Sequence, residues 1–442
     1  MAVVVFALVA LVVLALIGLV HRWLWVRLVR DTTTAGSRPR RALTAALWVL
    51  PLLSLAALVS GRAGAPFWFQ QAVAWPGYLW LPVLLYVTLA LLVAEPIRYA
   101  LLRRTPAPAG AADPAGTEPA VSALPVPEPA GPAGPAPEPS AAARPVPEDR
   151  GPAQSPGTGA GGDGENPLTR RVFVARALAG AAAAAAAGTV GYGTYGVLRG
   201  PRVKRVTVPL AKLPRAAHGF RIAVVSDVHL GPVLGRAHTL RIVDTVNATQ
   251  PDLIAVVGDL VDGSVADLGH AAEPLARLKS RHGAYFVTGN HEYFSGAAQW
   301  VDHVRELGLH PLENAREELP FFDLAGVNDI AGESEGQGPD FEKALGGRDR
   351  QRRAAVLLAH QPVVIHDAVA HGVDLQLSGH THGGQLWPGN YIAELANPTV
   401  AGLERYGDTQ LYVSRGAGAW GPPVRVGAPS DITVVELASY HA

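Results

Sequence analysis

Five short apolar runs in the second half of the chain each end in side chains that bind metal ions. The runs are rich in β-branched residues, which is typical of buried strands. Directly after them come Asp227 and His229, Asp259, Asn290 and His291, His360, and lastly His380 and His382. Because sites in α/β sheets gather at the carboxyl ends of strands, we expect these side chains to converge on one crevice. The pattern predicts an α/β domain built around a metal centre.

The last of these clusters has the spacing of metal ligands. His380 and His382 follow the apolar run 373–377 at positions i and i+2, so both side chains can leave the strand end toward one point. Alone, such a pair is equally compatible with a polar turn whose histidines face water. The four clusters upstream favour the metal site.

The types of ligand limit both the metal and the reaction. The chain contains no cysteine, so nitrogen and oxygen atoms must hold any metal ion. Asp, His and Asn suit manganese, iron or zinc, and a bridging carboxylate suits two ions about 3.5–4 Å apart. Such a pair can hold a hydroxide between the ions and neutralise phosphoryl oxygens, which favours hydrolysis of phosphate esters. A structural mononuclear site needs only about four ligands, fewer than this chain offers.

Taken in order, these motifs resemble the signature of the calcineurin-like metallophosphoesterase superfamily. They are Asp227-x-His229, Gly258-Asp259-x-x-Asp262, Gly289-Asn290-His291-Glu292, His360 and Gly379-His380-x-His382. The extension Gly383-Gly384-Gln385 and the later Ser414-Arg415-Gly416-Ala417-Gly418 resemble its bacterial branch of membrane-anchored or twin-arginine-exported phosphoesterases. The resemblance covers roughly residues 203–437.

The resemblance implies a fold and a role for each site residue. The family fold is α/β, with two packed mixed β-sheets flanked by helices. One divalent metal ion would be bound by Asp227, His229 and His382, and the other by Asn290, His360 and His380. Asp259 would bridge the two ions, and a hydroxide between them would attack phosphorus. His291 would donate a proton to the leaving oxygen or stabilise charge on the phosphoryl group.

Several polar residues near these motifs have more ordinary expectations. Asp262 is expected to support a ligand from outside the metal shell. Asn328 and Asp329 follow another apolar run and are candidates to border the site, and the segment 332–353 is expected to be a surface loop that sets specificity. The remaining histidines are expected to be solvated or hydrogen-bonded. They are His238, His270, His282, His303, His310, His366 and His371.

The first 104 residues predict an all-α transmembrane region. Hydrophobic residues make up 49% of the chain and charged ones only 17%, which is too apolar for an ordinary soluble enzyme. Three apolar runs, 2–20, 43–60 and 75–93, are each long enough to cross a bilayer as a helix. Arginines follow the first and third runs, so the positive-inside rule predicts an outside N-terminus and a cytoplasmic end after the third run.

Two segments connect this region to the α/β domain at residues 203–442. Residues 105–167 are mostly Ala, Pro, Gly and Glu, which predicts a disordered cytoplasmic linker. In segment 168–198, Arg170 and Arg171 precede an Ala-rich apolar run. This pattern fits a twin-arginine export signal or a fourth transmembrane helix equally well. Both interpretations place the α/β domain on the extracytoplasmic side of the cell membrane.

Together these features predict a multi-pass membrane phosphoesterase whose substrate is a phosphate ester, with phosphodiesters and lipid-linked or envelope-linked esters favoured. The formal net charge of +0 gives no excess of basic charge that would indicate binding of nucleic acid. The predicted partners are the substrate, the bilayer and, for the export interpretation, the twin-arginine machinery.

One alternative is a nucleotide-diphosphate-lipid pyrophosphatase, which would need a hydrophobic acyl groove by the site. Another is a membrane scaffold or transporter component with a metal-binding regulatory domain, which the lack of ionisable residues inside the three runs disfavours.

Overall fold

The apolar runs of the second half form two six-stranded mixed sheets in a computed structural model, which describes residues 2–103 and 170–440. The strand orders are β1-β12-β2-β3-β4-β5 and β10-β11-β9-β8-β7-β6. The first sheet contains β1 (Arg202–Leu210), β12 (Asp431–Ser439), β2 (Phe220–Val225), β3 (Leu253–Val257), β4 (Ala284–Val287) and β5 (His310–Pro311). The second contains β10 (Gly402–Tyr406), β11 (Thr409–Val413), β9 (Leu375–Ser378), β8 (Ala355–Leu358), β7 (Asp323–Gly326) and β6 (Ala315–Glu318). This pair of sheets confirms the predicted fold class.

The two sheets pack face to face with helices on both outer faces. Fully buried side chains from both sheets, such as Ile222, Leu253 and Leu377, fill the space between them. The first sheet is covered by α5 (Arg236–Ala248), α6 (Val265–Ala272) and α8 (Ala297–Glu306), and the second by α9 (Phe341–Leu345) and α10 (Ile365–Ala370). Because the central strands are buried on both faces, their sequences are continuous apolar runs rather than alternating ones.

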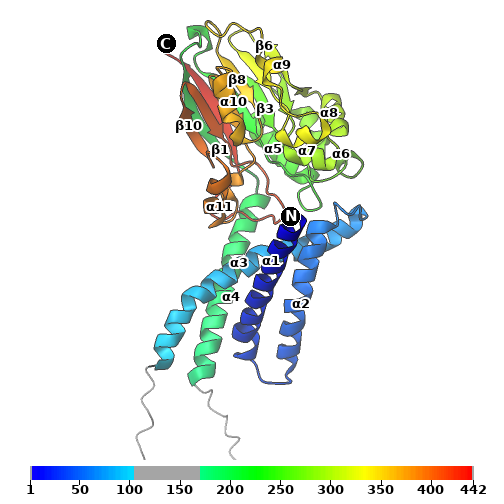
Figure 1. Ribbon diagram of the computed structural model, residues 1–442, viewed down its shortest axis with the longest axis vertical. Helices are drawn as coiled ribbons and strands as arrows, with labels where there is room; N and C mark the ends of the chain where they lie inside the picture. The colour runs from blue at the N-terminus through cyan, green and yellow to red at the C-terminus, as the bar shows by residue number, and fades with distance from the viewer. Residues whose placement is uncertain (1, 104–169, 441–442) are drawn as a thin grey trace, which may run out of the picture.

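A bundle of long helices lies at one end of the sheets (Figure 1). It contains α1 (Ala2–Leu24) with the π-helical η1 (Trp25–Arg30), α2 (Arg38–Val59), α3 (Phe67–Arg103) and α4 (Arg170–Leu198). Among the described residues, α2, α3 and α4 are long and apolar enough to cross a membrane. Helix α1 covers the first predicted run. The predicted linker at 105–167 lies outside the described residues.

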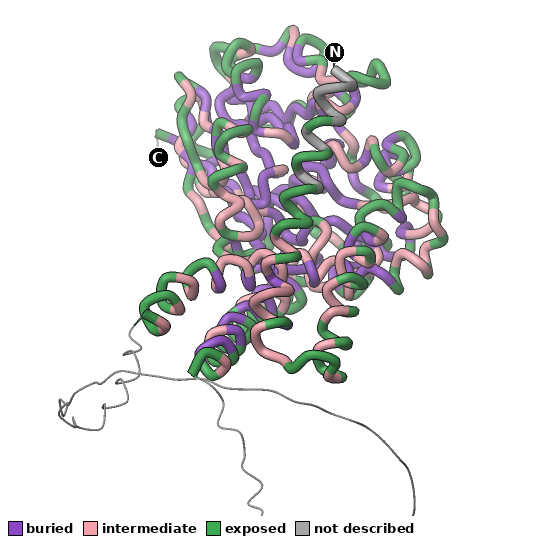
Figure 2. The backbone as a smooth tube through the Cα atoms, turned by 60° about the horizontal axis from the view of Figure 1, so that its bottom comes forward, coloured by how far each residue is buried: buried purple, intermediate pink, exposed green. Residues whose placement is uncertain are grey.

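Burial differs sharply between the two parts of the chain. Figure 2 shows buried segments concentrated inside the α/β part, while the bundle helices carry long exposed stretches. On α2, for example, Trp48, Leu52 and Leu55 are more than half exposed. Large apolar side chains on the outside of long helices are what a bilayer requires.

Helix α4 joins the bundle to the α/β part. Ala182, Ala186 and Val190 of α4 pack into one apolar cluster with Tyr86 and Leu91 of α3. Further along α4, Gly193 faces the segment that precedes β12. A Cβ atom on this glycine would lie 2.7 Å from Val424 Cγ1 and 2.8 Å from the carbonyl oxygen of Arg425. Only a hydrogen at this position allows so close an approach.

Local chemistry explains where the expected elements are wrong. The apolar spacing of residues 271–280 predicts a helix, but α6 ends at Ala272 and a 3₁₀ turn (Glu273–Arg277) follows, because Pro274 has no N–H to continue an α-helix. The apolar residues at 319–324 predict a strand, but the Leu319 N–H donates to the carbonyl of Phe322 in a turn around Pro320. The strand therefore starts only at Asp323.

The close contact at Gly193 makes a direct prediction. Gly193→Val should destabilise the full chain by about 1–3 kcal/mol, because the new side chain must displace the segment around Val424. Gly191→Val on the same helix is the matched control, since a Cβ there meets nothing within 4 Å. Thermal unfolding of both variants in detergent measures the difference. Equal midpoints for the two variants would contradict the packing described here.

Candidate metal centre

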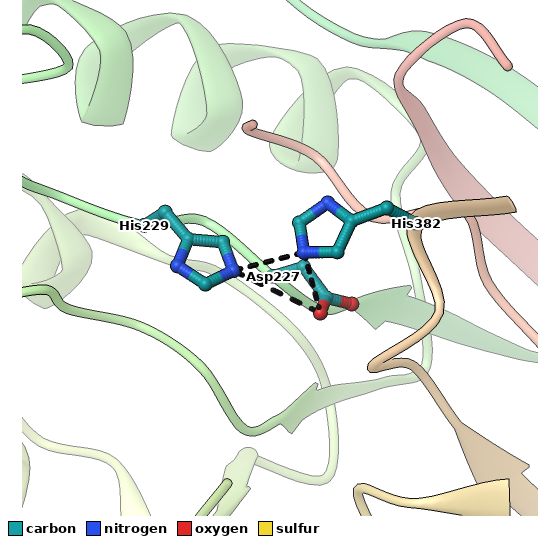
Figure 3. Close-up of side chains that lie close together, drawn as sticks. All are labelled: Asp227, His229 and His382. Atoms are coloured by element: carbon teal, nitrogen blue, oxygen red, sulfur yellow. Dashed lines mark hydrogen bonds and ion pairs between the residues drawn. The ribbon is translucent and has the colours of Figure 1, made fainter. Parts of the chain in front are cut away.

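The ends of five strands bring the predicted ligands together. Figure 3 shows Asp227, His229 and His382 pointing toward a common point, although His382 lies 153 residues from His229 in the chain. His229 Nε2 is 3.0 Å from His382 Nε2, and His382 Nε2 is 3.4 Å from Asp227 Oδ1. The three offer one ligand atom each, all within 4.8 Å of one another. This is the first candidate ligand set, and it overlaps a further group, His229, Asp259 and His291, whose atoms also lie within 4.8 Å of one another.

The second set is centred on Asp259. Asp259 Oδ2 lies 3.0 Å from His360 Nε2, and Asp259, His360 and His380 again offer atoms within 4.8 Å of one another. Asn290 joins this set, because its Oδ1 is 3.0 Å from His380 Nδ1. The same Asp259 oxygen is 3.8 Å from His229 Nε2, which belongs to the first set. Asp259 therefore lies between the two sets.

The backbone at the site is held in an unusual conformation. Eight non-glycine residues in the described part have positive φ, and five of them are predicted ligands. These five are Asp227, His229, Asp259, His380 and His382. A non-glycine residue in this region costs of order 1–3 kcal/mol and persists where the surrounding structure enforces it, which is characteristic of functional sites.

Glycines of the sequence motifs let the ligand loops approach one another. A Cβ on Gly379 would lie 1.7 Å from Ser226 Oγ and 2.3 Å from Asp227 Oδ2. A Cβ on Gly418 would lie 2.0 Å from the carbonyl oxygen of Val228. Because no side chain fits at these two positions, the loops after β9 and β11 can close over the loop that carries Asp227 and His229.

Burial and neighbouring charges set the protonation of the histidines in opposite ways. Burial, with the charges of His229 and Arg425, lowers the pKa of His382 well below its usual value, and burial with His360 lowers that of His380 to about 4. Burial also opposes the charge on His229, but Asp262 outweighs it and raises the pKa of His229 to about 9. His380 and His382 are thus held neutral, the form that binds metal.

The carboxylates complete a donor set that fits divalent cations. Burial opposes ionisation of Asp259, yet the charges of His360 and His229 and a hydrogen bond from His360 lower its pKa. Burial raises the pKa of Asp227, against the opposing charge of His360. The donors are imidazole nitrogens and carboxylate and amide oxygens, with one ionised carboxylate between two histidine clusters. Manganese, iron and zinc all accept such ligands.

Two supporting residues were not anticipated from the sequence. Glu292 is completely buried, and its carboxylate accepts the N–H groups of Asp259 (3.0 Å), Leu260 (2.7 Å) and Gly289 (2.6 Å), which ties two ligand loops together. Arg425 is 5% exposed and reaches the carbonyl oxygen and Nδ1 of His382 at 3.0 and 2.9 Å. Glu292 stands three residues after Gly289, the spacing of a capping box, and that signal could have identified it. Arg425 lies in a loop with no recognisable pattern.

Asp262 contacts two site histidines at once. Its Oδ1 atom is 2.9 Å from His229 Nδ1 and 2.7 Å from His291 Nδ1. It orients one candidate ligand and the candidate proton donor through a single carboxylate oxygen. The interpretation of Asp262 as a supporting residue agrees with these contacts.

The remaining sequence candidates have different surroundings. Asp329 is buried and accepts a hydrogen bond from Gln361 (2.9 Å), next to His360, whereas Asn328 bonds to Asn314 away from the ligand sets.

The expectation that His238 is solvated or hydrogen-bonded is wrong. His238 is 1% exposed, and neither ring nitrogen has a partner among the described residues. Burial, with Arg241 and Arg425 nearby, lowers its pKa to about 3, so the ring is neutral.

Comparisons with known proteins agree with this geometry. Residues 220–384 match the family model described as calcineurin-like phosphoesterase. Over 260 residues the chain is 39% identical to a Danio rerio protein named transmembrane protein with metallophosphoesterase domain, covering 56% of this chain and 59% of that protein. It is 34% identical over 241 residues to an uncharacterised metallophosphoesterase of Aquifex aeolicus, covering 53% of this chain and 91% of that protein.

A second bacterial relative matches over almost its whole length. The chain is 30% identical over 286 residues to the uncharacterised metallophosphoesterase YkuE of Bacillus subtilis, covering 62% of this chain and 98% of that protein. The match to the Danio rerio protein, in contrast, spans little more than half of that protein's length. The similarity thus extends to both bacterial and eukaryotic proteins.

The role of Glu292 can be tested by a small substitution. Glu292→Gln leaves one acceptor oxygen for three backbone N–H groups, so at least one buried donor loses its partner, and stability should fall by about 2 kcal/mol. Glu335→Gln is the matched control, since Glu335 is exposed. Thermal unfolding of both variants measures the effect. A variant at position 292 as stable as the control would show that the three hydrogen bonds do not hold the ligand loops.

Proposed function

The chain belongs to the calcineurin-like metallophosphoesterase family, and on this premise we propose that it is a membrane-anchored hydrolase of phosphate esters that uses two divalent metal ions. Hydrolysis of phosphoric esters is the activity expected of the family. Phosphodiesters are the proposed substrate class, and manganese, iron and zinc are the candidate metals. The proposal follows from the residues at the strand ends.

One observation carries the proposal, namely that Asp259 lies between two separate ligand sets. Asp227, His229 and His382 would hold one ion, and Asn290, His360 and His380 the other, with Asp259 shared. A closed structural site would not need a second set around a common carboxylate. When bound, the two ions would supply a deprotonated water as nucleophile and neutralise phosphoryl oxygens.

The surroundings of His291 support a role as the proton donor to the leaving oxygen. Its Nδ1 atom is fixed by Asp262 at 2.7 Å, and its ring lies 5.6 Å from that of Phe294 and 5.8 Å from that of Trp420, measured between centroids. These contacts orient the imidazole toward a cavity beside the ligands, which it lines. As the water oxygen bonds to phosphorus and the ester P–O bond breaks, His291 would donate a proton to the departing oxygen.

Charge at the far end of the bundle supports the proposed orientation in the membrane. Figure 1 shows the α1–α2 connection, the end of α3 and the start of α4 at the end of the bundle away from the α/β part. Arginines gather there, including Arg30, Arg103 and Arg170. The positive-inside rule would make this end cytoplasmic and the metal centre extracytoplasmic. We propose four crossings, with α4 as the fourth, because its packing on α3 suits a permanent helix better than an export signal.

The alternatives are less well supported. In the transporter or scaffold hypothesis, charges inside the bundle would mark a transport path. Glu95 instead pairs with Arg27 and Arg98, and Asp31 pairs with the same two arginines, at the arginine-rich end. The pyrophosphatase hypothesis shares the same candidate metal centre, differs in the substrate and would also need a hydrophobic acyl groove by the site.

Substitution of the shared carboxylate tests the two-metal proposal. The purified full chain with added manganese should hydrolyse bis-p-nitrophenyl phosphate, and Asp259→Asn should lower kcat at least about 100-fold, because both ligand sets lose their common charge. A chelator should abolish the activity and added metal should restore it. Metal content by mass spectrometry should fall in Asp259→Asn and stay unchanged in Asp244→Asn, an exposed control on α5. Bound metal without cleavage of either the diester or its monoester would refute the proposed function.

The role of His291 predicts a dependence on the leaving group. His291→Ala should lower kcat by about 10²–10⁴-fold for an alkyl phosphoester, whose leaving oxygen needs a proton. The loss should be much smaller for p-nitrophenyl esters, because nitrophenolate leaves without protonation. Metal content should be unaffected. Equal losses for both esters would instead assign His291 to charge stabilisation.

A further inference from the structure

A cavity beside His291 is lined by residues of both the α/β part and the membrane helices. Its volume is about 360 Å³. The α/β part contributes Asp262, His291 and Trp420, and the bundle contributes Leu58 of α2 and Arg62 of the following turn. The candidate proton donor thus faces a space whose other wall is the end of a helical hairpin of the membrane region.

One side of this cavity continues into the lipid-facing surface of the bundle. Leu52, Leu55 and Leu58 are 63%, 58% and 40% exposed, and Leu58 lines the cavity. At the rim, Phe294 and Trp420 are 60% and 48% exposed. Exposed leucines on a spanning helix contact acyl chains, and exposed aromatic rings are typical of the membrane interface. These side chains form an apolar path along α2 that ends at the cavity.

The other notable group in the cavity is a free cation. The Arg62 guanidinium carbon lies 5.5 Å from the centroid of the Phe294 ring, whose neighbour is His291. Arg62 is exposed, and no carboxylate pairs with it among the described residues. A guanidinium offers paired N–H donors that match the oxygens of a phosphate group. Because Arg62 and His291 both lie near the Phe294 ring and line the same cavity, a phosphate bound by Arg62 would be held in the space that the candidate proton donor faces.

The two helices that flank the turn carrying Arg62 pack closely against each other. Ser54 Oγ donates to the carbonyl of Gly77 at 2.7 Å, and Tyr78 donates through its hydroxyl to the carbonyl of Ala57 at 3.1 Å. A Cβ on Gly77 would lie 2.4 Å from the carbonyl oxygen of Leu53, so the helices touch through their backbones. These contacts hold the helices on both sides of the turn that lines the cavity.

We propose that the substrate is a membrane lipid with a phosphodiester headgroup, which enters from the bilayer along α2 and is bound at its phosphate by Arg62. This inference rests on the proposed function and names the substrate class of the same site. One water is consumed: its oxygen bonds to phosphorus, the P–O bond to the leaving alcohol breaks, and the alcohol oxygen takes the proton from His291. The apolar chains remain beside Leu58, outside the metal centre.

The test compares one phosphodiester with and without its acyl chains. The full chain with manganese is given phosphatidylglycerol in micelles of a phosphate-free detergent, the deacylated glycerophosphoglycerol in the same detergent, and bis-p-nitrophenyl phosphate. The kcat/KM for the lipid should exceed that for the deacylated compound by at least about tenfold, because the apolar path adds binding energy. Products are measured by mass spectrometry.

Variants separate the role of Arg62 from general effects. Arg62→Ala should lower kcat/KM for the lipid by about tenfold or more, mainly through KM, and should affect the small ester less. Arg103→Ala is the matched control, since Arg103 also lies over an aromatic ring, that of Tyr99, at the opposite end of the bundle. It should change neither activity.

The outcomes distinguish the two proposals. If bis-p-nitrophenyl phosphate is cleaved but the lipid reacts no faster than its deacylated form, the lipid inference is overturned while the proposed hydrolase stands. Equal losses on lipid and small ester in Arg62→Ala would also overturn it, because Arg62 would then serve any phosphoester. If no ester is cleaved although metal is bound, the proposed function itself fails.

Discussion

The carboxylate of Asp259 is the contact on which both ligand sets depend. Its Oδ2 atom faces His360 at 3.0 Å and His229 at 3.8 Å, and its Oδ1 atom accepts the N–H of His291 at 2.9 Å. Its own backbone N–H is bound by Glu292, and its φ is positive. A buried carboxylate on a backbone with positive φ would destabilise the fold if it had no partners. It is stable here because the loops after β2, β4 and β8 each contribute a partner, so Asp259 depends on the assembly of these loops.

The sequence predicts the residues at strand ends well because two independent regularities coincide there. Strands buried on both faces require continuous apolar runs, and a metal centre at their carboxyl ends requires Asp, Asn or His directly afterwards. Edge strands lack the first regularity. In β1 and β10 most residues are partly or fully exposed, so neither strand appears as an apolar run, and neither was expected.

Residues that support the site from a distance follow no such rule. Arg425 reaches His382 from a loop 43 residues later in the chain, and Arg62 reaches the cavity from the turn of a hairpin in the other part of the molecule. Their positions depend on how whole helices and strands pack together, and this packing cannot be predicted from the spacing of residues in a short stretch of sequence. His238 is the opposite case, a residue whose local sequence suggests exposure although the side chain is buried. This histidine, in an exposed-looking helical segment, is in fact buried with no partner in the part of the chain that the structure describes, because α5 lies against both the sheet and the bundle.

The candidate metal centre and the bundle are joined by direct contacts. Gly193 of α4 supports the backbone of Arg425, and Arg425 in turn fixes the ring and the carbonyl group of His382. In the loop that follows His382, the carbonyl of Trp387 accepts a hydrogen bond from Tyr86 of α3 at 2.9 Å. A fragment without the helices would leave Arg425 with one side unsupported and would remove a wall of the cavity beside His291. The chemistry of the site is therefore best measured on the full chain in a bilayer, where the helices that complete it are present.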